Sequence, residues 1–126
     1  MASTSDPSPS ERQVVEAYGD GRFRISGSVY TGSVIVLPDE TIVWPVSRFD
    51  EVDVASLEPV MSVADDVDIL LLGCGSRGEL APEPLSNAFR DAAISVEAMT
   101  TGAACRTYNV LAVEGRRVAA ALIAVD

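Results

Sequence analysis

The 126-residue chain contains no histidine and no lysine, and each absence excludes a class of chemistry. Without histidine there is no Ser–His–Asp or Cys–His pair, no imidazole metal ligand and no ordinary general base near neutral pH. Without lysine there is no Schiff base and no phosphate loop of the Walker A type. Two cysteines, Cys74 and Cys105, are too few for a thiolate zinc cage or a disulfide framework. The sequence therefore favours a protein that is not an enzyme, with no metal and no cofactor.

Positive charge is scarce as well. Nine arginines stand against 19 aspartates and glutamates, which gives a net charge of −10 at pH 7. Such an acidic chain is a poor counter-ion for nucleic acid or for anionic membranes. Its longest apolar run, residues 118–125, is far shorter than the roughly 20 residues that a membrane span needs. We expect no nucleic-acid partner and no membrane span.

The N-terminal segment is rich in Ser, Thr and Pro and has no apolar stretch of the kind that a secretory signal contains. We predict a disordered tail over residues 1–12 and a single domain over residues 13–126. Two cysteines without an export signal favour the reducing cytoplasm as the location of the protein.

The first half of the domain has the pattern of antiparallel strands. Phe23 and Ile25 alternate with polar residues after a turn at residues 19–21. Residues 33–37 and 41–44 are rich in β-branched side chains and flank Pro38-Asp39-Glu40, which predicts a hairpin.

The second half alternates between helix and strand. The run at residues 69–72 has no polar alternation, as is typical of a strand covered on both faces. Helices are predicted at 84–92 and 100–114, and further strands at 94–98 and 117–125. Residues 54–64 have helical spacing, although Pro59 must then lie in the first turn. A right-handed βαβ unit over residues 68–98 predicts parallel pairing. The predicted fold is α/β: a central mixed β-sheet with helices packed on it and an N-terminal antiparallel β-hairpin layer.

Residues Gly73 to Gly78 spell G-x-G-x-x-G after a predicted strand, which is the fingerprint of a dinucleotide site. Glu97 lies about 20 residues further on, where a ribose partner is expected. The last glycine of that fingerprint should open a helix, but Pro82 and Pro84 delay the helix here. We interpret the segment as a tight loop with exposed backbone.

A second constellation lies at residues 100–109. Thr100 or Thr101 is a good N-cap, and the small residues that follow leave the first helical amides accessible. Arg106 adds a fixed positive charge, so the segment is a candidate site for a small anion. The structural alternative is that the small residues allow close packing on the sheet, with Cys105 as a small buried side chain.

Both segments directly follow predicted strands, where open α/β sheets place their ligands. A site between them contains no catalytic residue. Its candidate ligand-binding residues are Gly75, Arg77, Thr100, Thr101, Cys105, Arg106 and Asn109.

The segments VEAMTTGAACRTYNVL (residues 96–111) and EGRRVAAALI (residues 114–123) closely resemble the domain-of-unknown-function 498/598 family. The resemblance to this family extends upstream to Tyr18-Gly19, residues 23–27, residues 30–38, Trp44 and residues 70–75. It therefore covers about residues 14–125. Two departures are Cys74, where the family commonly has a small threonine-type residue, and Thr100, which is often an aspartate.

The resemblance implies an α/β fold with a central mixed sheet and layers on both faces, and it implies no established catalytic activity. For mitochondrial members it implies protein interactions during the assembly of respiratory complex I. The leading hypothesis is therefore a soluble interaction or assembly module with a protein partner. The alternative is a protein or enzyme that binds a small anion or metabolite between the Gly73–Gly78 loop and the Thr100–Arg106 helix start.

Overall fold

The structure, a computed structural model, describes residues 12–126. A five-stranded sheet has the order β5-β4-β8-β6-β7, and a separate three-stranded sheet has the order β1-β2-β3. The strands are β1 (Val15–Gly19), β2 (Arg22–Ile25), β3 (Ser28–Thr31), β4 (Val34–Val36), β5 (Thr41–Val43), β6 (Ile69–Gly73), β7 (Ser95–Met99) and β8 (Val118–Leu122). The α-helices are α1 (Glu58–Met61), α2 (Glu83–Asp91) and α3 (Thr101–Val113).

The five-stranded sheet is mixed. Strand β6 pairs in parallel with both β7 and β8, whereas β4 pairs antiparallel with β8 and with β5. The β4–β5 pair is the predicted hairpin, with Val34 opposite Val43, and β6-α2-β7 is the predicted βαβ unit. The predicted mixed sheet and its antiparallel N-terminal layer are confirmed.

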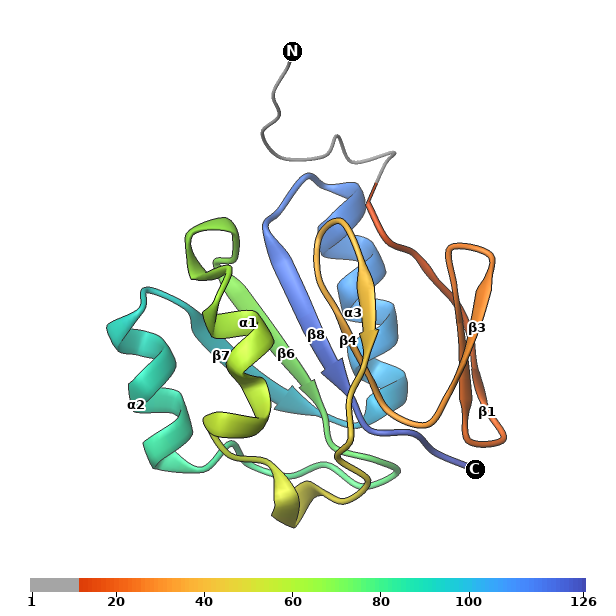
Figure 1. Cartoon of the computed structure of the whole chain (residues 1–126), viewed down its shortest axis with the longest axis horizontal. Helices are drawn as coiled ribbons and strands as arrows, with labels where there is room; N and C mark the ends of the chain where they lie inside the picture. Colours follow the sequence, from red (N-terminus) through yellow and green to blue (C-terminus); the bar gives the residue numbers. More distant parts are fainter. Residues whose placement is uncertain (1–11) are drawn as a thin grey trace.

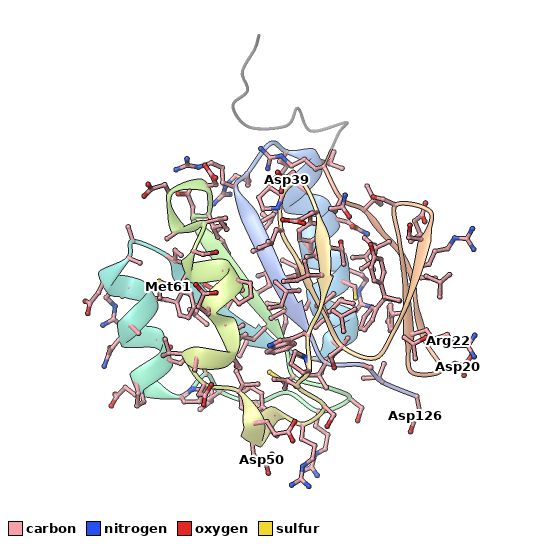
Figure 2. The ribbon with its side chains drawn as sticks, in the orientation of Figure 1. Asp20, Arg22, Asp39, Asp50, Met61 and Asp126 are labelled. Carbon is pink, nitrogen blue, oxygen red and sulfur yellow. The ribbon has the colours of Figure 1, made fainter. Side chains whose placement is uncertain are left out.

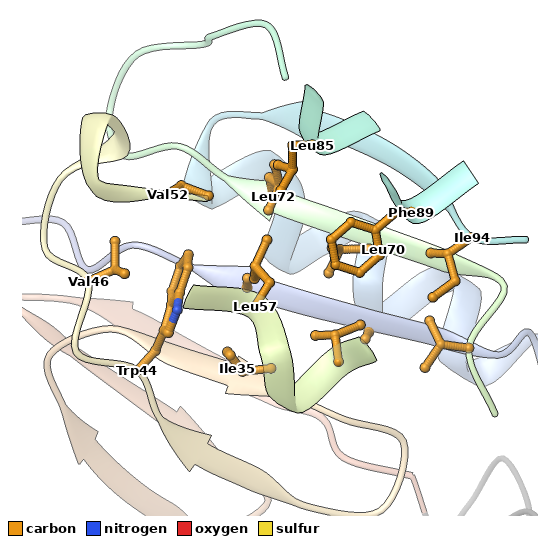
Figure 3. Close-up of a cluster of buried hydrophobic side chains, with 14 of the residues drawn as sticks. Ile35, Trp44, Val46, Val52, Leu57, Leu70, Leu72, Leu85, Phe89 and Ile94 are labelled. Carbon is orange, nitrogen blue, oxygen red and sulfur yellow. The ribbon is translucent and has the colours of Figure 1, made fainter. Parts of the chain in front are cut away.

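Layers cover both faces of this sheet. In Figure 1, α2 lies at the left of the molecule and the sheet of β1 to β3 lies at the right, with the five-stranded sheet between them. Leu70 and Leu72 point into a cluster shared with Leu57, Leu85 and other side chains on the α1 and α2 side (Figure 3). Their neighbour Leu71 points the other way, into a cluster built on α3 and the small sheet. Both faces of β6 are buried, and this explains the absence of polar alternation in its sequence.

Helix α3 packs closely on the centre of the sheet. Strand β8 contributes Ala119, Ala120 and Ala121, all fully buried. Because Ala120 presents only a methyl group to the α3 side, the helix can approach and bury Ala104 and Tyr108 against the strand.

Two segments differ from the prediction. The helix expected over residues 54–64 is broken into a 3-10 turn (Ala55–Leu57), the single turn α1 and a second 3-10 turn (Ala64–Asp66). Pro59 lies at the second position of α1, where it needs no hydrogen-bond donor, and no long helix continues beyond it. Strand β3 was not predicted as a separate element. It follows a turn in which Ser26 and Gly27 both have positive φ, 48° and 86°, as a type I′ two-residue hairpin turn requires.

Arg12, which the prediction placed in the tail, is only 6% exposed and donates a hydrogen bond to the carbonyl oxygen of Arg116. The ordered domain thus includes Arg12, and the remainder of the predicted tail, residues 1–11, lies outside the described residues. None of the helices within residues 12–126 has the length and apolarity to cross a membrane.

Replacing Tyr108 with phenylalanine tests the packing of α3. The Tyr108 hydroxyl is buried without a hydrogen-bond partner among residues 12–126, and burial raises the pKa of this phenol. Because Tyr108→Phe removes a buried, unsatisfied polar group, we expect the free energy of unfolding in urea to stay equal or to rise by up to about 1 kcal/mol. Tyr30→Phe, at a partly buried tyrosine, is the control. A loss of more than about 1 kcal/mol would show that the Tyr108 hydroxyl has a partner.

Candidate functional site

A single buried hydroxyl ties three segments together at the carboxyl ends of the parallel strands. The Thr101 side chain is fully buried at the start of α3. Its Oγ1 accepts a hydrogen bond from the Gly75 N–H at 2.9 Å and donates one to the carbonyl oxygen of Ile123 at 2.7 Å. The Thr101 N–H in turn donates to the Gly75 carbonyl oxygen at 2.8 Å. These hydrogen bonds fix the loop after β6, the start of α3 and the segment after β8 to one another. We call this contact of three segments the Thr101 junction.

Two glycines permit this close approach. A Cβ atom at Gly73 would lie 3.0 Å from both Thr101 Cα and Leu122 Cδ2, so a larger residue would push β6 away from the α3 start. Gly75 has a φ of +102°, a conformation that L side chains rarely adopt. The loop beyond β6 therefore depends on glycine for its path over the helix start.

Above this junction lies an open groove of about 680 Å³. Its walls are the end of β1 (Tyr18), the turn at residues 47–49, the loop at residues 74–79, the start of α3 and residues 123–126. The groove is at the end of the molecule marked by Asp126 and Asp50, opposite Asp39 (Figure 2). This is the position beyond the strand carboxyl ends at which open α/β sheets bind ligands.

Positively and negatively charged side chains both line the groove. Three of the nine arginines line it: Arg48, Arg77 and Arg106. The Arg48 guanidinium is paired with Asp50 at 2.7 Å, and Arg106 donates to the Tyr18 hydroxyl at 3.4 Å. The carboxylates in the lining are those of Glu79 and Asp126. Guanidinium, carboxylate and hydroxyl groups bind ligands by charge and hydrogen bonding, and none of them is a proton acceptor with an ordinary pKa near 7.

Four of the seven predicted site residues, Gly75, Arg77, Thr100 and Arg106, line this groove together. The other three have structural partners. Thr101 forms the junction described above. The Asn109 side-chain amide accepts from the Val15 N–H at 2.9 Å and donates to the Val15 carbonyl oxygen at 2.8 Å, which attaches β1 to α3. Cys105 packs in the core on the α3 side of the sheet, as the structural alternative stated.

The amides at the start of α3 are less accessible than predicted. The Ala103 N–H donates to the Thr100 side chain, which is the N-cap, and the Ala104 N–H donates to the Thr100 carbonyl oxygen. The Tyr18 hydroxyl lies over Gly102, only 2.5 Å from where a Cβ atom would be. The expectation that the small residues leave these amides open is therefore wrong, because side chains and backbone already use most of them.

The cysteines are poor nucleophiles here. Cys74 and Cys105 are 7% and 2% exposed, and burial raises the pKa of both thiols, that of Cys105 to about 12. Both thiols are therefore protonated in the folded protein near neutral pH, and the thiolate is the reactive form.

The G-x-G-x-x-G segment does not have the arrangement of a dinucleotide site. Helix α2 begins at Glu83, well after Gly78, so the last glycine of the segment does not open the following helix as the fingerprint requires. Within the described part of the chain, no cluster of three or more acidic or cysteine side chains is arranged to hold a metal ion.

Tyr18 and Arg48 are among the groove residues that sequence reasoning missed. Tyr18 is 88 positions from Arg106, its hydrogen-bond partner, and no local pattern relates the two. Arg48 reaches the groove because the Glu51 carboxylate accepts hydrogen bonds from the N–H groups of Ser47 and Arg48, which shapes that turn. These bonds lower the pKa of Glu51. An acid three residues after Arg48 was the only signal available.

Comparison with known families assigns the chain to one of them. The family described as "Protein of unknown function (DUF498/DUF598)" matches residues 15–123, and the chain belongs to this family, as its C-terminal motif predicts.

Two relatives show how widely the domain occurs. An uncharacterised protein of Rhodobacter capsulatus is 38% identical over 109 residues, which cover 86% of this chain and 82% of that protein. The NADH dehydrogenase (ubiquinone) 1 alpha subcomplex assembly factor 3 of Danio rerio is 33% identical over 110 residues, or 87% of this chain. The match spans only 63% of that assembly factor's length.

A solved structure has the same fold. The crystal structure described as that of an outer membrane protein from Bartonella henselae aligns with a TM-score of 0.82 and 34% identity. The alignment covers 97% of this chain and all of that one.

Replacing Thr101 tests the junction. Thr101→Val leaves the Gly75 N–H and the Ile123 carbonyl without their partner, so we expect the free energy of unfolding to fall by about 2–4 kcal/mol. Thr101→Ser keeps the hydroxyl and should lose only about 1 kcal/mol, through the missing methyl group. Thr107→Val is the control, because the Thr107 hydroxyl lies on the same helix and forms no hydrogen bond with the described residues; it should change stability by about 0.5 kcal/mol or less. Equal losses for Val and Ser at position 101 would contradict this role.

Thiol reactivity tests the burial of the cysteines. At mildly alkaline pH, a disulfide reagent such as DTNB should modify both thiols of the native protein about a hundredfold more slowly than those of the protein unfolded in guanidinium chloride. Cys74→Ala and Cys105→Ala variants assign each reaction phase to one thiol. A native thiol that reacts as fast as in the unfolded chain would refute the conclusion that it is protonated and buried.

Proposed function

We propose that this protein is a binding module that holds a protein partner during the assembly of a respiratory NADH dehydrogenase. The observation that carries the proposal is the relationship to the assembly factor of Danio rerio, whose matching part covers 87% of this chain. That relative is longer than the match, so its role comes to this chain only as part of the proposal.

The chemistry of the groove supports binding over catalysis. Its ionisable side chains are arginines, carboxylates, the phenol of Tyr18 and the buried Cys74 thiol. A general base needs a pKa near the working pH, and no residue in the groove has an ordinary pKa there. Groups of this kind are suited to orienting and holding a partner by charge and hydrogen bonding.

The outer face of α3 supports a protein partner. Arg106, Val110 and Val113 follow one another at helical spacing, and the two valines are 56% and 70% exposed. The opposite face of the same helix is buried against β6 and β8. Large exposed valines in a row on a helix are suited to burial in an interface. We define Arg106, Val110 and Val113 as the α3 stripe; through Arg106 it is continuous with the groove.

Deletion of the gene in its host tests the assembly role. We expect the deletion strain to contain less fully assembled NADH dehydrogenase, measured by in-gel activity after native electrophoresis, and the wild-type gene to restore it. The double variant Val110→Ser/Val113→Ser should fail to restore it, because it removes the apolar part of the α3 stripe. Since both positions are exposed, the variant should unfold within about 0.5 kcal/mol of the wild type.

Val29→Ser/Val43→Ser is the matched control, since both valines are exposed on strands outside the α3 stripe. It should restore assembly fully. A deletion strain with a normal amount of assembled NADH dehydrogenase would overturn the proposed function. Equal failure of both double variants would overturn the assignment of the α3 stripe.

A further inference from the structure

We propose that the groove also binds a small molecule through an oxyanion, a carboxylate or phosphate group held between the guanidinium groups of Arg77 and Arg106. This goes beyond the proposed function and does not depend on it, because a small ligand can be detected in the groove of the isolated protein, with no partner present.

Arg77 and Arg106 are among the arginines for which no ion pair forms within the described residues of this very acidic protein. Acidic residues number 19 against nine arginines, and ion pairs form at Arg24, Arg48 and Arg117. Among residues 12–126, Arg77 has neither an ion pair nor a hydrogen bond. Arg106 has only the 3.4 Å hydrogen bond to the Tyr18 hydroxyl. Both guanidinium groups therefore have free donors, and both line the same groove.

The groove has the size of a small-molecule site and a backbone that is held in place. Its volume of about 680 Å³ is within the range of small-molecule sites, about 300–1,000 Å³. The two arginines come from different segments, the loop after β6 and the helix α3, and the Thr101 junction fixes these segments to each other. A ligand therefore meets a floor that is already formed, and binding costs little ordering of the backbone.

The charged groups of the groove favour one kind of ligand. A guanidinium presents a planar fork of donors that matches carboxylate and phosphate oxygens. Glu79 and Asp126 line the same groove, and their negative charge disfavours a polyanion. The same carboxylates accept hydrogen bonds, so the best ligand combines one oxyanion with a donor such as a hydroxyl group. The amides at the start of α3 are mostly engaged within the fold, so the arginine side chains are the donors that would meet the ligand.

Titration followed by NMR of the ¹⁵N-labelled protein tests the proposal, with inorganic phosphate and lactate as separate probes at constant ionic strength. We expect saturable shifts of amides around the groove, at Gly75, Arg77 and Gly102, with at least one probe. The probe that saturates identifies the oxyanion as phosphate or carboxylate. Arg77→Gln and Arg106→Gln should each weaken binding about tenfold, the loss of one charge-assisted hydrogen bond.

Arg90→Gln is the matched control, because Arg90 is an exposed arginine on α2 outside the groove, bonded to Asn87. It removes the same charge and should leave both dissociation constants unchanged. Shifts that do not saturate with either probe would overturn the proposal. So would an equal weakening by Arg90→Gln and Arg77→Gln, since it would show that binding responds to the loss of any positive charge and not to a site in the groove.

Discussion

The Thr101 hydroxyl is the constraint on which the groove depends. It is fully buried, it accepts a hydrogen bond from Gly75 and it donates one to Ile123, so its donor and one acceptor position are used within the fold. A valine of similar size could fill the space but would leave two backbone groups unpaired. The three segments that meet here follow the ends of β6, β7 and β8. By bonding to them, the hydroxyl holds together the backbone that forms the floor of the groove.

Within one short stretch of α3, the residues of one face have structural roles and those of the other face are available for binding. Thr101, Cys105 and Asn109 face inward and connect the helix to the loop, the core and β1. Arg106 faces outward into the groove, and the exposed Val110 follows on the same face. The helix thus serves packing on one side and recognition on the other. This division fits a binding module, because the inward face fixes the position of the groups that meet a partner.

Local patterns predicted most of the fold. The β4–β5 hairpin and the β6-α2-β7 unit join segments that are close in sequence. Their turn residues and hydrophobic periodicities can therefore be recognised in the sequence itself. Contacts between distant residues could not be predicted in this way. Asn109 bonds Val15 across 94 positions, and Tyr18 reaches Arg106 across 88. For the same reason Thr101 was predicted to face a ligand, since its partner Ile123 is 22 positions away and nothing near Thr101 in the sequence marks it as buried.

Native-state hydrogen exchange at Gly75 tests the central claim, that one buried hydroxyl fixes the floor of the groove. If the Gly75 N–H is held by Thr101, its exchange should require the same large opening as that of Leu71 in β6, although Gly75 lies in a loop. The amide of Arg77, two residues further along the exposed part of this loop, should exchange rapidly in the same experiment. A Gly75 amide that exchanges as fast as that of Arg77 would contradict the account.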